Sequence, residues 1–223
     1  RWNDKKLKAS NPGQSLPDLA VTVVQRSDGS GTTYIFSDFM SKISTEWESV
    51  VGRGKSLQWP VGIGAKGNPG VAGTIKQTEG AVGYIGSEFA FAQKIPFAQV
   101  ENSAGNYVLP SLESISAAAQ GDIPEDTKVD IPSSTKVMLT CSSDPDAYPI
   151  SGFTWIILYK EQNYNGRSLA QAEETLNFLS WMIEKDAQAL AQQVNYAQLP
   201  AKTVAQAKAI LASVKYDGTP VLK

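Results

Sequence analysis

Residues 21–33, VTVVQRSDGSGTT, give the clearest structural signal in the chain. Residues 21–25 form a β-branched run bounded by turn-forming residues, which predicts a buried strand. Apolar residues then recur at helical spacing, at Tyr34, Ile35, Phe39, Met40 and Ile43. Residues 26–33 (RSDGSGTT) are therefore expected at a junction where a strand ends and a helix begins.

This junction contains the groups that an oxyanion site needs. A helix N-terminus leaves backbone N–H groups unpaired and has a partial positive charge. Gly29 and Gly31 allow the backbone to approach a ligand, and Arg26 offers a planar fork for two anion oxygens. We expect Asp28 to hold that fork through a salt bridge. Further donors are the hydroxyls of Ser30, Thr32 and Thr33.

The same segment has a plainer interpretation, in which Ser30 or Thr32 is only a helix cap and the glycines only form the turn. It is not a Walker P-loop, because that motif would place a lysine where Gly31 and Thr32 stand. It also lacks the GxGxxG spacing of dinucleotide-binding loops. A catalytic serine would need a lysine base here, and no lysine is close in sequence.

The composition restricts the function further. The chain has 223 residues, 42% hydrophobic and 19% charged, which is room for one large domain or two lobes. A net charge of −2 gives no overall attraction to nucleic acid, and no apolar run reaches the roughly 20 residues of a membrane helix. Histidine is absent, which removes the commonest general base and zinc ligand. We therefore expect no catalytic residues, no metal site and no cofactor.

The rest of the chain predicts an α/β part followed by a helical part. Helices are expected after Ser44, over residues 71–77 and 87–94, and from a cap at Ser111 to Gly121; a short strand is expected within residues 80–86 and a strong one over 148–160. Residues 169–194 and 204–214 predict two helices with apolar stripes. Two helices cannot bury such a stripe alone, so we expect another part of the protein to cover it.

Several motifs together resemble the periplasmic phosphate-binding proteins of the high-affinity phosphate ABC transporter. They are RSDGSGTT, WPVGIGAKGNPGVAG, GAVGYIG, YPISGFTWIILYK and NYAQLPAKTVAQAKAIL, and they follow in order along the chain. The resemblance implies a lobe of the type II periplasmic-binding-protein fold, a mixed sheet flanked by helices, over residues 1–152. Residues 153–223 would then be a hinge strand and C-terminal helices of an incomplete second lobe.

The resemblance also implies a function and a site. It makes the chain an extracytoplasmic solute-binding protein, periplasmic or in the cell envelope of a bacterium, that delivers inorganic phosphate to ABC permease subunits and is not an enzyme. Arg26 would be the charged phosphate donor and Asp28 its orienting partner. The other phosphate-binding residues would be Ser30, Gly31 and Thr32, through hydroxyl and backbone donors.

The chain departs from the family at its beginning. The GATFPAP-like turn, GSSGG-like loop and SDAP-like segment of the family's first lobe do not occur. We therefore expect the chain to begin within something longer and to hold about half of the site. The partner that completes it would be the missing N-terminal lobe or a second chain.

Two other functions stay open from the sequence. A phosphatase-like or phosphate-releasing enzyme could use the same loop, and so could an interaction module in which the loop is vestigial. Lys66 and Asn68 belong to a second glycine-rich loop that either borders the cleft or is a plain turn. Cys141, the only cysteine, is expected to be a small, at least half-buried hydrophobe. Core positions are expected for Trp59, Phe153, Trp155 and Trp181.

Overall fold

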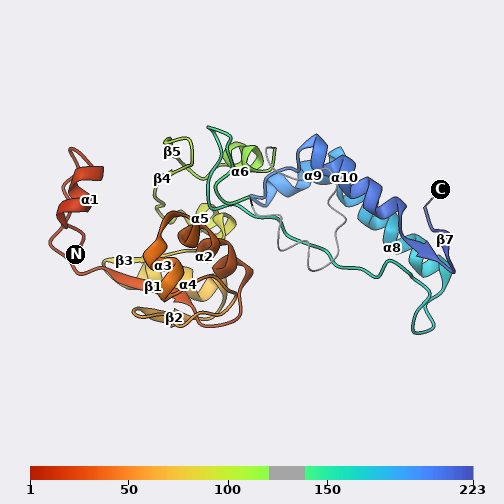
Figure 1. The fold of residues 1–223 in the computed structure, drawn as a ribbon, viewed down its shortest axis with the longest axis horizontal. Coiled ribbons are helices and arrows are strands. Elements are labelled where there is room, and N and C mark those ends of the chain that lie inside the picture. Colours follow the sequence, from red (N-terminus) through yellow and green to blue (C-terminus); the bar gives the residue numbers. More distant parts are fainter. Residues whose placement is uncertain (121–138, 223) are drawn as a thin grey trace. The chain divides into compact units, whose positions relative to one another are not determined.

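The computed structural model describes residues 1–120 and 139–222. The chain forms two compact units, a first unit at Arg1–Phe97 and a second unit at Ala98–Lys223 (Figure 1). The lobe boundary predicted between residues 152 and 153 lies within the second unit and stays a prediction. Both units combine helices with strands, so the predicted α/β class is confirmed.

The first unit is built on a parallel sheet of three strands in the order β2-β1-β3. The central strand β1, Thr22–Arg26, is the predicted one, and its Val24 is fully buried. On either side lie β2 (Ile63–Ala65) and β3 (Ala81–Gly83). Arg26 pairs with Ala65 at the end of β2, so both strands end at the same edge of the sheet.

Helices make up the rest of the regular structure in the first unit. They are α1 (Lys5–Ser10), α2 (Gly31–Ile43), α3 (Thr45–Val50), α4 (Gly67–Gln77) and α5 (Ser87–Gln93). Ser44 separates α2 from α3 because its hydroxyl accepts the Trp47 N–H at 3.1 Å, which confirms the predicted cap. Helix α4 packs against all three strands, and Val71 is buried against Val24 and Ala65.

The second unit has two short antiparallel strand pairs and mostly helices. The strands are β4 (Val100–Glu101) with β5 (Tyr107–Val108), and β6 (Lys215–Tyr216) with β7 (Thr219–Pro220). The helices are α6 (Leu112–Ala118), α8 (Leu169–Met182), α9 (Lys185–Gln193) and α10 (Ala201–Ala212). Ser111 caps α6 as predicted, whereas Gly121, its predicted end, lies outside the described residues.

The helix predicted over residues 169–194 is in fact two helices. Helix α8 ends at Met182 and α9 begins at Lys185, because Glu184 has an extended backbone (φ −81°, ψ 159°). Side chains hold this break: Gln188 Nε2 donates to the Met182 carbonyl at 2.8 Å, and Lys208 pairs with Glu184 at 2.7 Å. Apolar periodicity continues across the break and therefore does not reveal it.

The strong strand predicted over residues 148–160 is not formed in the part of the chain that the structure describes. Residues 151–159 belong to no helix or strand there, and the first ladder contact is an isolated bridge between Glu161 and Lys215. A strand requires a neighbour to pair its backbone, and these residues have none among the described ones. The apolar side chains of Ile156 and Ile157 are consequently exposed, by 55% and 69%.

The predictions of core positions for tryptophan side chains were partly wrong. Trp155 is 40% exposed and Trp181 46% exposed, so neither is a core residue in this chain. Phe153 is partly buried, against a cluster of Ala118, Ala119, Leu139 and Ala147. Cys141 is half-buried, as expected.

Among the described residues, no helix combines the length and the apolar character that crossing a membrane requires.

Candidate anion-binding site

The predicted oxyanion loop connects the C-terminal end of β1 to the first turn of α2 (Figure 1). Ser30 is the helix N-cap: its backbone is extended, and its Oγ accepts the N–H of Thr33 at 3.1 Å. Ser30 is 3% exposed, so its hydroxyl lies within the first turn rather than on the surface. Ser30 is therefore the helix cap, and its hydroxyl still has its own proton to donate.

The first turn of α2 contains two N–H groups without an acceptor in the part of the chain that the structure describes, those of Gly31 and Thr32. The neighbouring groups are occupied, because Ser30 N–H donates to the Lys55 carbonyl at 2.9 Å and Thr33 N–H donates to Ser30. A Cβ placed on Gly31 would meet no atom within 4 Å. The two unpaired donors thus belong to an open helix end, where a partial positive charge favours anions.

The hydroxyl of Thr33, expected among the ligand donors, points to the protein interior instead. Thr33 is 1% exposed, and its Oγ1 shares a hydrogen bond of 2.6 Å with the Tyr84 hydroxyl. The same Tyr84 oxygen accepts the backbone N–H of Arg26 at 3.3 Å. Tyr84 therefore ties the end of β1 to the first turn of α2.

The Arg26 and Asp28 side chains form the two-pronged ion pair that the sequence predicts. Arg26 Nε donates to Asp28 Oδ1 at 2.8 Å, and Arg26 Nη2 donates to Oδ2 at 2.7 Å. Two groups from the beginning of α4 extend the pair: Gly67 N–H donates to Asp28 Oδ1 at 3.1 Å, and Asn68 Oδ1 accepts from Arg26 Nη1 at 3.1 Å. The guanidinium is thereby held on several sides.

These hydrogen bonds fix the charges of the pair. The bonds from the Arg26 guanidinium, followed by the Gly67 N–H, hold the pKa of the Asp28 carboxyl well below its usual range. The bond to Asp28 raises the pKa of Arg26 above its already high ordinary value. Both groups are charged at neutral pH, and they cancel each other, so the loop attracts an anion through local donors rather than net charge.

Aromatic side chains hold Tyr84 in place. Its ring stacks on Phe36 with centroids 4.5 Å apart and an interplanar angle of 10°, and on Trp59 at 5.9 Å and 25°. Trp47 contacts both Phe36 and Trp59 edge to face, at 5.9 and 5.8 Å. The ring positions are mutually restricted, so the Tyr84 hydroxyl is a fixed support for the loop.

Sequence reasoning missed Tyr84, and it left the glycine-rich loop around Lys66 and Asn68 between two interpretations. The structure brings the loop around Lys66 and Asn68 next to the ion pair, because β1 and β2 are parallel neighbours with their carboxyl ends at the same edge. In open α/β sheets this edge is where ligands bind. The signal was present as a second glycine-rich strand-to-helix junction, but only strand pairing shows which junctions are adjacent.

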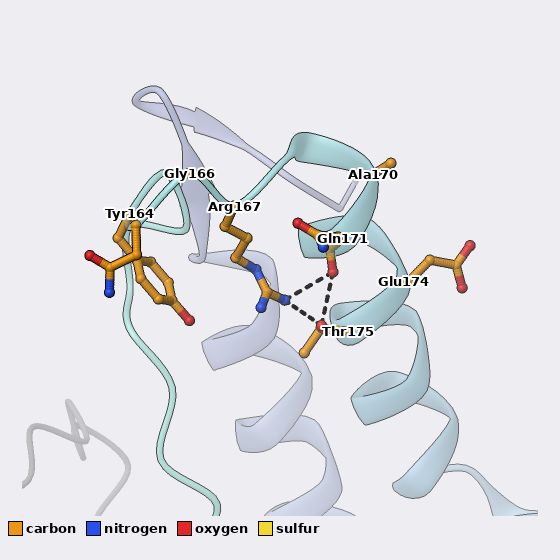
Figure 2. A pocket seen from close by; sticks show the side chains of 8 residues that line it. Tyr164, Gly166, Arg167, Ala170, Gln171, Glu174 and Thr175 are labelled. Carbon is orange, nitrogen blue, oxygen red and sulfur yellow. Dashed lines mark hydrogen bonds between the residues drawn. The ribbon is translucent and has the colours of Figure 1, made fainter.

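A separate hollow of about 670 Å³ lies in the second unit and contains none of these residues. Figure 2 shows Arg167 in its wall, where Nη2 donates to the Gln171 carbonyl at 2.9 Å and to the Thr175 hydroxyl. The guanidinium also lies 5.9 Å from the centre of the Tyr164 ring.

Residues 1–120 and 139–222 include no cluster of three acidic, cysteine or histidine side chains suited to a metal ion.

Comparison with known proteins identifies the family of the chain. The family model of the PBP superfamily domain matches residues 1–186. Phosphate-binding protein PstS of Xylella fastidiosa is 38% identical over 213 residues, which is 96% of this chain and 56% of that protein. Phosphate-binding protein PstS of Pasteurella multocida is 34% identical over 94% of this chain and 58% of its own length. The chain spans rather more than half the length of these curated relatives.

Solved structures agree on the fold. A crystal structure of a DING protein superposes with a TM-score of 0.65 at 18% identity, over 90% of this chain and 61% of that one. A high-affinity periplasmic phosphate-binding protein (PfluDING), solved with phosphate bound, superposes with a TM-score of 0.59 at 21% identity. This superposition also covers 90% of this chain and 61% of that one. The predicted resemblance to phosphate-binding proteins is confirmed by the sequence relatives, and the structural neighbours confirm the fold.

Proposed function

This chain belongs to the PBP superfamily, and we propose that it binds inorganic phosphate as the solute-binding component of an ABC transporter. The observation behind the proposal is the pair of unpartnered N–H groups on Gly31 and Thr32, within six residues of the Arg26–Asp28 ion pair. The relatives named phosphate-binding proteins support the choice of ligand. The proposed phosphate donors are Arg26, Ser30, Gly31 and Thr32.

The hydrogen-bond inventory of Arg26 and Asp28 assigns them different roles. A guanidinium has five N–H groups, and three of those on Arg26 are used by Asp28 and Asn68, which leaves one on each terminal nitrogen for phosphate. Both Asp28 oxygens already accept hydrogen bonds. We therefore propose that Asp28 orients Arg26 and neutralises its charge rather than contacting the ligand.

We further infer that another region, in the same polypeptide or in a second chain, completes the phosphate site. The support is twofold: this chain spans little more than half the length of its relatives, and residues 151–159 pair with no strand in the described structure. An additional lobe would supply both a strand partner and the remaining ligand contacts. We place the complete protein outside the cytoplasm, where a carrier meets its permease, and expect it to have a binding role rather than a catalytic one.

The test uses two substitutions that differ in a single donor. Gly31 is the first residue of α2, a position where proline is tolerated, and the preceding Ser30 has the extended backbone that proline requires (φ −140°, ψ 130°). Gly31→Pro thus removes the N–H while keeping the helix, and Gly31→Ala keeps the N–H in open space. Isothermal titration with phosphate should show about tenfold or greater weakening for Gly31→Pro only, since hydrogen bonds to charged groups contribute about 1.5–3 kcal/mol.

Arg26→Ala is the second arm of this test. Removing one member of a buried charge pair costs on the order of 2–5 kcal/mol, and Arg26→Lys should recover only part of it because an ammonium has no fork. Wild-type affinity in Gly31→Pro and Arg26→Ala would refute the site. Hydrolysis of a phosphate ester would favour the phosphatase-like alternative, and no binding of phosphate by the complete wild-type protein would favour an interaction module.

A further inference from the structure

The beginning of α4 contacts both members of the ion pair in the oxyanion loop. Its Gly67 N–H donates to Asp28, and its Asn68 Oδ1 accepts from Arg26. Gly67 has a left-handed backbone (φ +69°), which an L side chain would strain. This turn directs two successive residues at the loop, one through the main chain and one through the side chain.

The placement of Asn68 follows from the sheet. Arg26 and Ala65 are paired at the ends of β1 and β2, so the residues that follow each strand emerge side by side. The Arg26 side chain is only 12% exposed and cannot move far without losing these contacts. Asp28 restrains the edge of the guanidinium formed by Nε and Nη2. Among the described residues, Asn68 alone restrains Nη1.

We infer that Asn68 is a positioning residue that fixes the Arg26 guanidinium for anion binding; this inference rests on the phosphate-binding function proposed above. A single ion pair of this kind still allows the guanidinium to tilt about its shared edge. A third contact on Nη1 removes that freedom before the ligand arrives. Preorganised donors bind more tightly because less motion is lost on binding.

Phosphate titration of variants gives the first readout. Asn68→Ala should weaken phosphate binding about tenfold, the lower end of what outer-shell partners contribute at metal sites. In the Arg26→Lys background the same substitution should cost about twofold or less, because a lysine has no plane to orient. The matched control is Gln77→Ala, which removes an exposed amide from the last residue of the same helix and should bind as wild type.

Side-chain NMR of Arg26 gives a second readout that needs no phosphate. In the wild-type chain the Nη1 protons should give resolved signals, because Asn68 restricts rotation of that group. In Asn68→Ala the Nη1 signals should merge while the Nε signal persists, since Asp28 still holds that edge. A purely structural role for Asn68 would instead disturb both signals and lower the unfolding temperature.

The two readouts separate the inference from the proposed function. Failure of the complete protein, including the region that we propose completes the site, to bind phosphate would overturn the function, whereas the NMR arm still decides whether Asn68 orients Arg26. Equal phosphate affinity of wild type and Asn68→Ala, or unchanged Nη1 signals in that variant, overturns the positioning role. The positioning role is also overturned if Asn68→Ala weakens phosphate binding equally in the wild-type and Arg26→Lys backgrounds. Asn68 would then act independently of the guanidinium.

Discussion

At the scale of the residue, the oxyanion loop offers an anion directed N–H donors without a net positive charge. Arg26 and Asp28 form an ion pair whose charges cancel, and the chain as a whole is slightly acidic. Attraction of an anion therefore depends on where individual N–H groups point, not on a positive surface. Neutral, directed donors are screened less by salt than a surface charge is, which is consistent with the proposed carrier role.

Asp28 should make the chain sensitive to acid. Its pKa is lowered in the folded state, first by the bonds from Arg26 and then by the Gly67 N–H, so its contribution to stability is present above the ordinary carboxyl pKa of about 4. That contribution is lost as the pH falls below about 4 toward the folded-state pKa. Asp28→Asn should therefore be less stable than wild type at pH 6, and the difference should shrink on acidification.

Thermal unfolding followed between pH 2 and pH 6 measures this difference. A useful control is Asp146→Asn, an exposed carboxylate of the second unit without an ion pair among the described residues. Its stability difference from wild type should stay small across the range. A constant difference for Asp28→Asn at every pH would mean that the ion pair does not stabilise the fold.

At the scale of the element, the sequence predicted whatever depends on neighbouring residues. The strand over residues 21–25, the helix that follows it and the cap at Ser44 are local patterns of burial and hydrogen bonding, and all are confirmed. The contact of Asn68 with Arg26 was not predictable in the same way. It depends on the parallel pairing of β1 with β2, which brings together two residues that are 42 positions apart in the sequence.

The failures at element scale have the same cause. Residues 148–160 have the composition of a strand, but composition does not provide the second strand that pairing requires. The break between α8 and α9 was missed because Gln188 and Lys208, which hold it, act through contacts that apolar periodicity does not record. Local patterns thus define which segments can form an element, and tertiary partners decide whether they do.

Gln188 gives an element-scale prediction. Its Nε2 donates to the Met182 carbonyl at the end of α8, and its Oε1 accepts the Leu199 N–H before α10, both at 2.8 Å. Gln188→Ala leaves these part-buried groups without that partner, which should lower the free energy of unfolding by about 1–3 kcal/mol. Gln193→Ala, an exposed glutamine at the end of α9, should cost about 0.5 kcal/mol or less.

Urea denaturation monitored by circular dichroism compares the two variants. Phosphate affinity should be unchanged in both, because the substitutions lie in the second unit and the proposed ligand donors lie in the first. Similar losses of stability in Gln188→Ala and Gln193→Ala would show that the break between the helices does not depend on this bridge.

At the scale of the whole molecule, the distribution of apolar surface supports the proposal that another region completes the protein. Helices α8 and α10 bury a common cluster, in which Leu176 is fully enclosed. Other apolar side chains of α8 are nonetheless exposed, Leu169 by 45% and Phe178 by 57%. Ile156 and Ile157 are also exposed, and an additional region would cover exposed apolar side chains of this kind.

The last prediction concerns this uncovered surface. The isolated chain should bind a hydrophobic fluorescent dye, and replacing Ile156 and Ile157 together by serine should reduce that signal, because both side chains are largely exposed. The same pair should change the unfolding temperature little, since exposed side chains contribute little packing. Leu176→Ala, in contrast, should cost about 2–5 kcal/mol, because it empties a fully buried site. If the serine pair unfolds the chain as severely as Leu176→Ala does, residues 156 and 157 are part of its own core, and no additional region is needed to cover them.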